Sequence, residues 1–428
     1  MSAIEDAMLI PLPPPEHVVT SWRSALSQVR SGSTSRKMAL AQIKSARGAA
    51  RMALAAALPS LTGTGRMTQH LITGEGQIFT GNGLEATGVP NPNPAYRGAL
   101  TLRQPLLALS TWHAHGTAKR RTELAELNAE ETERVILAGV ADALVTAVTT
   151  EHLAELSRVS LRAALSTLDL TRRRARLGAA TALDILRAEQ EVTLSRTQVV
   201  GSAESVRLAR EALGIALGSD HPWSVDPSVS MDELARDAKG VCRSFRGIDE
   251  RGDIRAAKLN ADIAQRNTDG VKWRYAPTLD LQSDFTRSNS RGTLNNRPFQ
   301  WSISALLTVP FFDGGSRYGE HTARSADESV AREQLTEARR LARAEVQRTQ
   351  RGIQVATLHL KLSRDRRTFA RESARLARLT FASGTGTSFD LVDAARRARE
   401  SELDLALKEF DLVRAKITAF LAQANCAT

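Results

Sequence analysis

Four segments of the chain alternate apolar and polar residues with the period of a β-strand, and they fall into two pairs. The first pair covers 59–68 and 96–104, and the second covers 277–285 and 299–309. In the last segment every odd-numbered residue is apolar and most even-numbered residues are polar. Period 2 over about ten residues predicts strands with one apolar and one polar face.

Each strand pair is followed by a long stretch with helical character and no proline. These stretches cover 112–176 and 317–381. At 1.5 Å per residue, a helix of about 60 residues would extend roughly 90 Å. A second helix follows each one after a glycine-containing turn and ends at Leu217 or Leu421. Between 403 and 421 apolar residues recur at three- and four-residue steps, which is typical of a coiled-coil-like seam.

Shorter elements complete each half of the chain. A basic helix is predicted before each strand pair, over 36–57 and 253–273. The segments that join the two strands of each pair, 73–94 and 287–297, are rich in Gly, Asn and Pro and are predicted to be loops.

The two halves also share sequence motifs. The motif Gly-x-x-Thr-x-x-Asp-x-x-x-Ala occurs at 178–188 and again at 384–394. Because three such anchors recur in the same order, the sequence indicates a duplication of about half the chain. The other two anchors are proline-containing strand starts (58–61 and 276–279) and strand ends (104–107 and 309–312).

The sequence therefore predicts a mainly α protein with a small β part, built from duplicated helical hairpins. Each repeat would contain a helix, two strands and a long helical hairpin. The predicted parts are an N-terminal tail (1–20), a first repeat (21–217), a linker (218–250), a second repeat (251–423) and a C-terminal tail (424–428).

Composition and charge exclude several classes of protein. Hydrophobic residues make up 42% of the 428 residues, which excludes a disordered chain. The net charge of +11 would suit nucleic acid or anionic lipid, but aromatic residues are only 4%, so the stacking platforms of a nucleic-acid partner are not predicted. Two cysteines exclude a disulfide scaffold and a cysteine-based zinc site.

Chemistry-bearing residues do not gather into an enzyme site. His113 and His115 are two residues apart and do not share a helix face. The spacing supports no Ser-His-Asp arrangement, no paired carboxylates and no phosphate-binding glycine loop. The sequence therefore predicts no enzyme, no catalytic residue, no cofactor and no metal site.

Signals for a membrane helix or for export are weak. The most apolar run, 135–150, contains Asp142 and is shorter than the roughly 18 residues of a membrane-spanning helix, so no such helix is predicted. Residues 1–20 have acids and four prolines where a secretory signal has a basic start and an apolar core, so no signal peptide is predicted.

The strands suit a different way of crossing a membrane. Strands of about ten residues are long enough to cross an outer membrane, but an open sheet edge is not tolerated in lipid. Since four strands cannot close a barrel, several copies of the chain would have to pool them, and three copies would give twelve. The alternative is a soluble coiled-coil structural protein with a small β cap and no pore. A basic coiled coil that binds nucleic acid ranks last because it lacks a recognition motif.

The order of these motifs resembles that of the TolC-type outer-membrane efflux proteins, over about 25–421. The resemblance rests on the duplicated glycine turn at 178–188 and 384–394 and on the proline-containing strand end before each long helix. The segment 251–256, Arg-Gly-Asp-Ile-Arg-Ala, also looks like the Arg-Pro-Asp-Leu-x-Ala of the family, with Gly in place of Pro.

The resemblance implies a trimeric export channel for efflux or type I secretion. Three chains would share a transmembrane β-barrel in the outer-membrane lipid, and their helices would form an α-helical tunnel through the periplasm. The partners would be a periplasmic adaptor protein and an inner-membrane transporter. The barrel strands would face lipid with Leu279, Leu281, Phe285, Phe299, Trp301, Ile303 and Leu307.

The hairpin turns are the second candidate site. Gly178 and Gly384 fit the position after a helix end, where positive φ favours glycine, and the following threonine and aspartate match a capping box. The resemblance implies that these turns contact the adaptor and that nearby charges form the channel constriction. The adaptor-contact candidates are Leu177, Gly178, Thr181, Ser383, Gly384 and Thr385, and the constriction candidates are Asp390, Asp393, Asp184 and Arg187.

Overall fold

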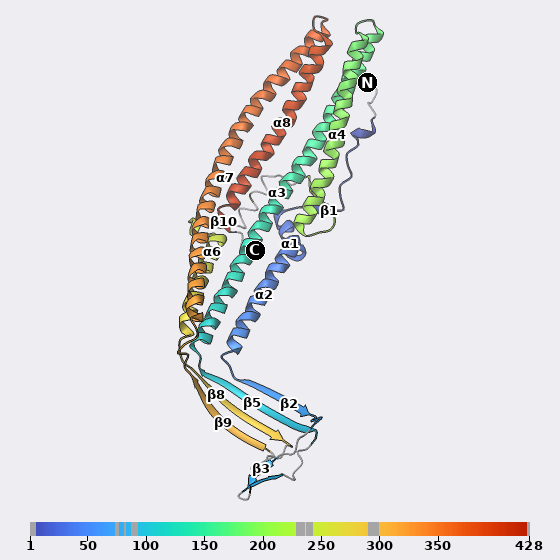
Figure 1. Ribbon diagram of the computed structural model, residues 1–428. Coiled ribbons are helices and arrows are strands. Elements are labelled where there is room, and N and C mark those ends of the chain that lie inside the picture. The colour runs from blue at the N-terminus through green and yellow to red at the C-terminus, as the bar shows by residue number, and fades with distance from the viewer. Residues whose placement is uncertain are drawn as a thin grey trace. The chain divides into compact units, whose positions relative to one another are not determined.

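The computed structural model describes residues 6–72, 77–80, 83–86, 93–227, 236, 243–289 and 299–425 (Figure 1). This part of the chain divides into two compact units. Unit 1 comprises Met1–Ala41, Leu127–Arg255 and Thr336–Thr428, and unit 2 comprises Gln42–Glu126 and Ala256–Leu335.

The predicted helices are confirmed to within a few residues at each end. The long ones are α3 (Leu109–Arg176) and α7 (Ser316–Ala382), each followed by a second helix, α4 (Ala182–Leu217) or α8 (Ser388–Leu421). The shorter helices are α2 (Thr34–Ala55) and α6 (Gly252–Trp273), and α1 (Trp22–Gly32) precedes them.

The four predicted strands form one antiparallel sheet in unit 2, in the order β2-β5-β8-β9 (Figure 1). Strands β2 and β9 are therefore its two edges. The strands from the two halves of the sequence meet at the β5–β8 pair, where a bulge lies between Pro105 and Leu107. The four strands are β2 (Ser60–Thr68), β5 (Ala95–Leu107), β8 (Thr278–Ser288) and β9 (Phe299–Thr308).

The prediction of a loop over 73–94 is wrong in part. Within it, β3 (Gln77–Thr80) and β4 (Gly83–Ala86) pair as a short antiparallel hairpin. The four-residue strands are too short to show a clear period of two, so the Gly- and Asn-rich composition dominated the prediction. The predicted loop over 287–297 lies mostly outside the described residues, and β8 extends into its start.

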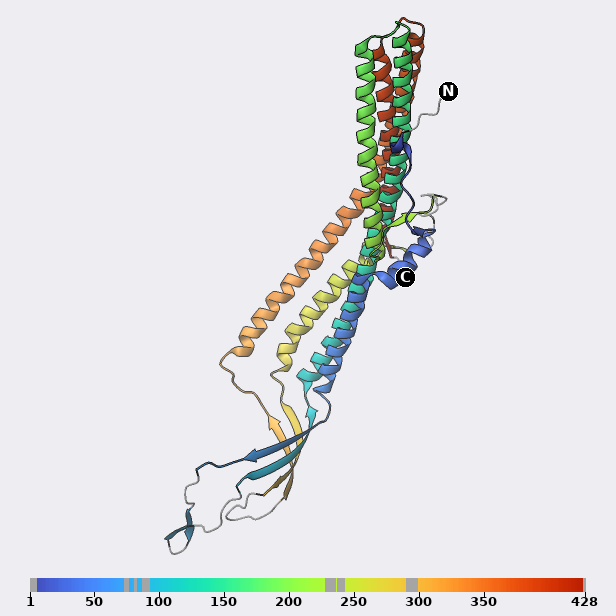
Figure 2. The same cartoon turned by 90° about the vertical axis from the view of Figure 1, so that its right-hand side faces the viewer.

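Unit 1 contains the two helical hairpins, α3–α4 and α7–α8, except for the first parts of α3 and α7, which belong to unit 2. Within unit 1 the hairpins lie side by side with their turns at the same end (Figures 1 and 2). Along α3 and α4, Leu161, Ala164, Ala188 and Val192 form a small buried cluster near the turn. Further along, a larger core includes Leu144 of α3 and Leu213 of α4. Burial of such apolar side chains, and not helix propensity, holds helices of this length together.

The two predicted tails and the predicted linker contain short strands that pair with one another in unit 1. Strand β1 (His17–Val19) pairs in parallel with β6 (Trp223–Val225), and β7 (Arg243–Ser244) pairs with β10 (Ala424–Asn425). Val19 and Val225 reach the larger core. These pairings join segments far apart in sequence, so no local sequence pattern predicts them. Two 3-10 turns, Ala7–Leu9 and Ile248–Glu250, complete the described elements.

One described helix, α3, contains an 18-residue stretch apolar enough to cross a membrane by length and composition. The sequence prediction missed it because it required an uninterrupted run, which Asp142 breaks. One third of that stretch is buried. Since α3 contributes Leu137, Val140 and Leu144 to the core of unit 1, its apolar character has an explanation without a membrane.

Candidate functional site

One face of the four-stranded sheet is mostly apolar. Directly paired residues of antiparallel strands lie on the same face. The pairs Phe285–Trp301 and Leu279–Leu307 therefore place apolar side chains of β8 and β9 together, and Leu100 of β5 joins them opposite Phe285. The predicted lipid-facing residues all lie on this face, together with the polar residues Gln104, Ser283 and Arg287. Its larger apolar members, together with Ala305, are Leu61, Met67, Tyr96, Leu100, Leu102, Leu279, Leu281, Phe285, Phe299, Trp301, Ile303 and Leu307.

This apolar face is exposed in the single chain. Every residue of β9 is exposed, and Trp301 and Ile303 keep 70% and 64% of their surface accessible. Large apolar side chains in a row at such exposure mark a surface that another apolar phase or partner covers.

Two polar residues of β8 lie on this face: Arg287, which pairs with Phe299 near the end of the strand, and Ser283, whose polarity is compensated. Ser283 pairs directly with Ile303, so it points to the apolar side. Its Oγ accepts a hydrogen bond of 2.9 Å from Trp301 Nε1. The same contact satisfies the indole N–H, which would otherwise be costly to place in an apolar phase.

The opposite face of the sheet carries a ladder of charged and polar side chains. Arg103 of β5 forms an ion pair of 2.8 Å with Asp280 of β8. Thr101 donates a hydrogen bond of 2.7 Å to Asp284, which also accepts one from Gln282. The sequence placed the two aspartates on the polar face of their strand. Their partners could not be known until the β5–β8 register was fixed.

The hairpin turns have the backbone conformation predicted for them. Gly178 and Gly384 have φ of +73° and +86°, a region that a side chain with a Cβ resists. Both capping boxes are present, Thr181 with Asp184 and Thr387 with Asp390. The turn residues proposed to contact an adaptor (Leu177, Gly178, Thr181, Ser383, Gly384, Thr385) are all exposed.

Side chains join the two hairpins near their turns. Asp184 at the start of α4 accepts a hydrogen bond from the Ser388 hydroxyl at the start of α8. Ser388, together with the Thr181 backbone N–H, holds the pKa of the Asp184 carboxyl below its ordinary value. A second contact joins α3 to α7. The Arg174 guanidinium donates a hydrogen bond of 2.9 Å to the Phe381 backbone carbonyl and lies 4.0 Å from the centre of the Phe381 ring.

The four constriction candidates have different local partners. Asp393 forms ion pairs with Arg396 at 2.7 Å and Arg397 at 2.8 Å, and Arg396 in particular lowers the pKa of that carboxyl. Arg187 lies 4.0 Å from Asp184 and 5.7 Å from the centre of the Phe389 ring. Asp390 is exposed and caps its own helix through Thr387. Within one chain the structure thus does not pair Arg187 with Asp393.

A buried ion cluster in unit 1 escaped the sequence reasoning. Arg251, only 4% exposed, contacts both carboxylate oxygens of Asp253, at 3.0 and 2.8 Å, and Glu345 of α7 at 2.8 Å. It also donates to the Ala422 carbonyl at the end of α8. Burial disfavours the charge, but the hydrogen bonds to both acids outweigh it and raise the pKa of Arg251.

The cluster explains Arg251 and Asp253 in the segment 251–256, which the sequence singled out only as a motif. Gly252, between them, is buried at the start of α6. The signal available in the sequence was an arginine two residues before an aspartate at a helix start. Its partners on α7 and α8 are about 90 and 170 positions away, beyond any local pattern.

The family model described as outer membrane efflux protein matches residues 25–219 and 248–422. The chain belongs to the outer membrane efflux protein family. The two matched ranges correspond to the two halves recognised in the sequence, and the export channel predicted there is the function of this family. A soluble coiled-coil structural protein finds no support in these matches.

Individual relatives agree with the family and differ in how much of them the chain spans. The outer membrane protein TolC of Vibrio cholerae is 20% identical over 76% of this chain and 75% of that protein. The fusaric acid resistance protein FusA of Burkholderia cepacia is 28% identical over 34% of this chain, and the match spans only 29% of FusA. The outer membrane protein VceC of Vibrio cholerae has the same fold, with a TM-score of 0.77 at 18% identity over 94% of this chain and 95% of that chain.

The chain is thus a helix-rich member of a family of outer membrane efflux proteins, and solved structures that share its fold include the outer membrane channel CmeC of Campylobacter jejuni. Among the residues that the structure describes, no group of three or more His, Cys, Asp and Glu side chains is placed to hold a metal ion.

Proposed function

We propose that this member of the family acts as a homotrimer whose chains pool their sheets into one closed, twelve-stranded barrel in the outer membrane. The observation that carries the proposal is the exposed apolar face of a sheet with two open edges, β2 and β9. Lipid would cover the face, and pairing of β9 of one chain with β2 of the next would remove both edges. The polar ladder of Arg103, Asp280 and Asp284 would then line the lumen.

The assembly is tested by the mass of the purified protein in mild detergent. We expect a particle of three chains that keeps its β-sheet signal in circular dichroism, because an unpaired edge leaves backbone N–H and C=O groups unsatisfied in the apolar phase. A monomer that retains the full β signal would contradict the pooled barrel.

The helical hairpins would extend into the periplasm and form the tunnel. Their exposed turns would bind a periplasmic adaptor protein, which in turn would connect the channel to an inner-membrane transporter. The positive-φ glycines and the capping boxes support this role, since they place Leu177 and Thr385 on tight turns between two helices.

Adaptor contact is tested by cross-linking in the source bacterium. A photo-reactive residue at Leu177 or Thr385 should give a covalent adduct with an adaptor protein, because both side chains are exposed on the turns. The matched control is the same residue at Arg351, which is exposed in the middle of α7. Adducts of equal yield at all three positions would argue against a docking site at the turns.

The charges near the turns would form the constriction of the tunnel, with Asp390 and Asp393 on α8 and Asp184 and Arg187 on α4. Threefold symmetry would repeat each charge around the axis. Three like charges at close range raise the cost of ionisation unless cations or arginines compensate them. Arg396 and Arg397 provide such compensation for Asp393.

Single-channel recording of Asp393→Ala tests the constriction. Removing the carboxylate leaves two arginines without this partner, so we expect closed-state conductance to rise and cation selectivity to fall. Asp365→Ala, which removes an exposed acid of α7, is the control and should leave both unchanged. If Asp393→Ala conducts like the wild type in both respects, the constriction lies elsewhere.

A further inference from the structure

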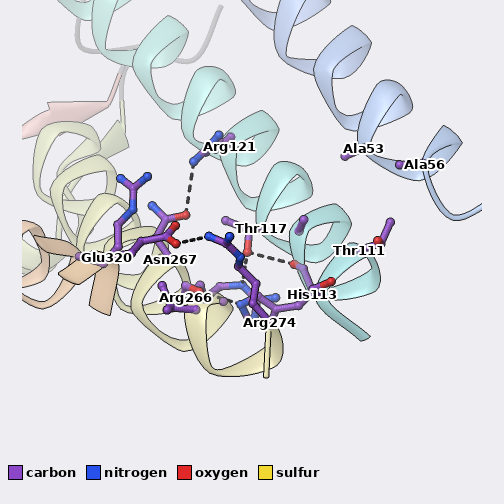
Figure 3. Close-up of a pocket in the computed structure, with 15 residues that line it drawn as sticks. Ala53, Ala56, Thr111, His113, Thr117, Arg121, Arg266, Asn267, Arg274 and Glu320 are labelled. Carbon is purple, nitrogen blue, oxygen red and sulfur yellow. Dashed lines mark hydrogen bonds and ion pairs between the residues drawn. The ribbon is translucent and has the colours of Figure 1, made fainter. Parts of the chain in front are cut away.

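A pocket rich in arginine lies among the helices of unit 2 (Figure 3). It has a volume of about 480 Å³ and is lined by α3, α6 and α7, with Ala53 and Ala56 at or just beyond the end of α2. A second pocket shares Ala56 and Thr111 with it and reaches Ser60 and Thr278, where β2 and β8 begin. The arginine pocket is therefore close to the start of the sheet.

The lining carries a clear excess of positive charge. Four arginines contribute to it, against one glutamate. Arg274 is paired with that glutamate, Glu320, and Arg324 contacts Asp327 at 3.4 Å. In the described part of the chain, the guanidinium groups of the other two, Arg121 and Arg266, contact only neutral oxygens.

Those neutral contacts hold the two guanidinium groups in place at the pocket wall (Figure 3). Arg121 donates to the Asn267 side-chain oxygen at 3.3 Å, and Arg266 donates to the Thr117 hydroxyl at 3.3 Å. Thr117 is buried. Each guanidinium has five N–H donors, so most of them stay available for a ligand.

A helix glycine makes room for this arrangement. A Cβ at Gly116 of α3 would lie 2.7 Å from Arg266 Nη2, so the end of the Arg266 side chain would have to shift. The His113 Nε2–H in turn donates to the Arg266 carbonyl at 2.7 Å. Glycine within a helix lowers stability relative to alanine. The close approach of the Arg266 side chain to α3 accounts for a glycine at position 116 despite this cost.

We propose that this pocket binds a phosphate group. Planar guanidinium forks recognise phosphate oxygens in pairs, and two of them here lack a carboxylate partner. The inference rests on the proposed function for the source of the ligand: with the sheet in the membrane, the pocket lies at the level of lipid head groups. The phosphate would come either from a head group or from a soluble phosphate compound.

Calorimetric titration of the full-length protein in detergent with inorganic pyrophosphate tests the site. Arg266→Gln should weaken binding about tenfold, the usual effect of losing hydrogen bonds to a charged group. Gly116→Ala keeps every charge but displaces Arg266, and it should also weaken binding. Arg51→Gln, which removes an exposed arginine of α2 outside the pocket, is the control and should change affinity less than about twofold.

Two results would overturn the proposal: no binding of pyrophosphate to the wild type, or the same loss in Arg51→Gln as in Arg266→Gln, which would mean diffuse attraction to a basic protein. Repeating the titration in nanodiscs that contain phosphatidylglycerol identifies the source of the phosphate. If the pocket binds a lipid head group, the lipid competes and the apparent affinity for pyrophosphate falls. If the pocket binds a soluble phosphate compound, the affinity for pyrophosphate stays the same. Bilayer recording separates this question from the proposed function, since a wild type that conducts but binds no pyrophosphate would refute the site alone.

Discussion

Replacing Ile303 by arginine is expected to lower the free energy of unfolding by about 2–4 kcal/mol, the range for a cation placed at the bilayer midplane on the lipid face of a barrel. Ile303 lies in the middle of β9, is 64% exposed in the single chain and shares its face with Trp301 and Leu307. The neighbouring Ser302 points to the other face, opposite Asp284. Ser302→Arg should therefore cost much less.

The two variants place the same arginine at neighbouring positions of one strand, so they differ in the side on which the charge lies and in the residue replaced, an apolar Ile or a small Ser. Reversible unfolding by denaturant in lipid vesicles, followed by tryptophan fluorescence, gives both free energies. Equal costs at Ile303 and Ser302 would mean that neither face contacts lipid and that the sheet is soluble. A larger cost at Ser302 would mean that the two faces are reversed.

Replacing Arg251 by methionine should destabilise unit 1 by about 3 kcal/mol, the lower end of the cost of removing one partner from a buried ion cluster. The variant leaves Asp253 and Glu345 close together without their shared cation, and the Ala422 carbonyl loses its donor. The two carboxylates are partly exposed, with 31% and 43% of their side-chain surface accessible, so water relieves part of the repulsion.

Arg255→Met is the matched control for Arg251→Met. Arg255 lies one turn further along α6 and forms an exposed ion pair with Glu130, at 3.3 Å. Exposed pairs contribute roughly 0–1 kcal/mol, so this variant should unfold nearly like the wild type. Thermal unfolding followed by the helical circular dichroism signal compares the two. If both variants lose the same stability, the cluster around Arg251 contributes no more than a surface pair.

The sequence by itself determined most of the local architecture. The four strands follow from a period of two that runs through about ten residues, and the helices from long proline-free stretches with apolar seams. Gly178 and Gly384 marked the hairpin turns because only a residue without Cβ takes positive φ without strain. The capping boxes that begin α4 and α8 could also be predicted, since their hydrogen bonds join residues three positions apart.

The side of each strand that is apolar could likewise be predicted, because alternation alone sets it. How far the apolar face extends across the sheet could not be predicted, because it depends on the pairing of the strands. Leu100 of β5 joins Phe285 of β8 only because the two halves of the chain pair at that register, and the contact of Ser283 with Trp301 depends on it too. A shift by one residue would have placed Asp280 and Asp284 on the apolar side.

Only the tertiary structure decided which charges from distant parts of the chain meet. The ion pairs of Asp393 are local by contrast, because Arg396 and Arg397 lie three and four positions further along the same helix. Arg251 meets Glu345 and the end of α8, and Arg266 reaches the wall of α3 at Gly116. Long side chains on helices reach partners that depend on which helix faces lie together, and that packing is a property of the whole chain, which no local periodicity encodes.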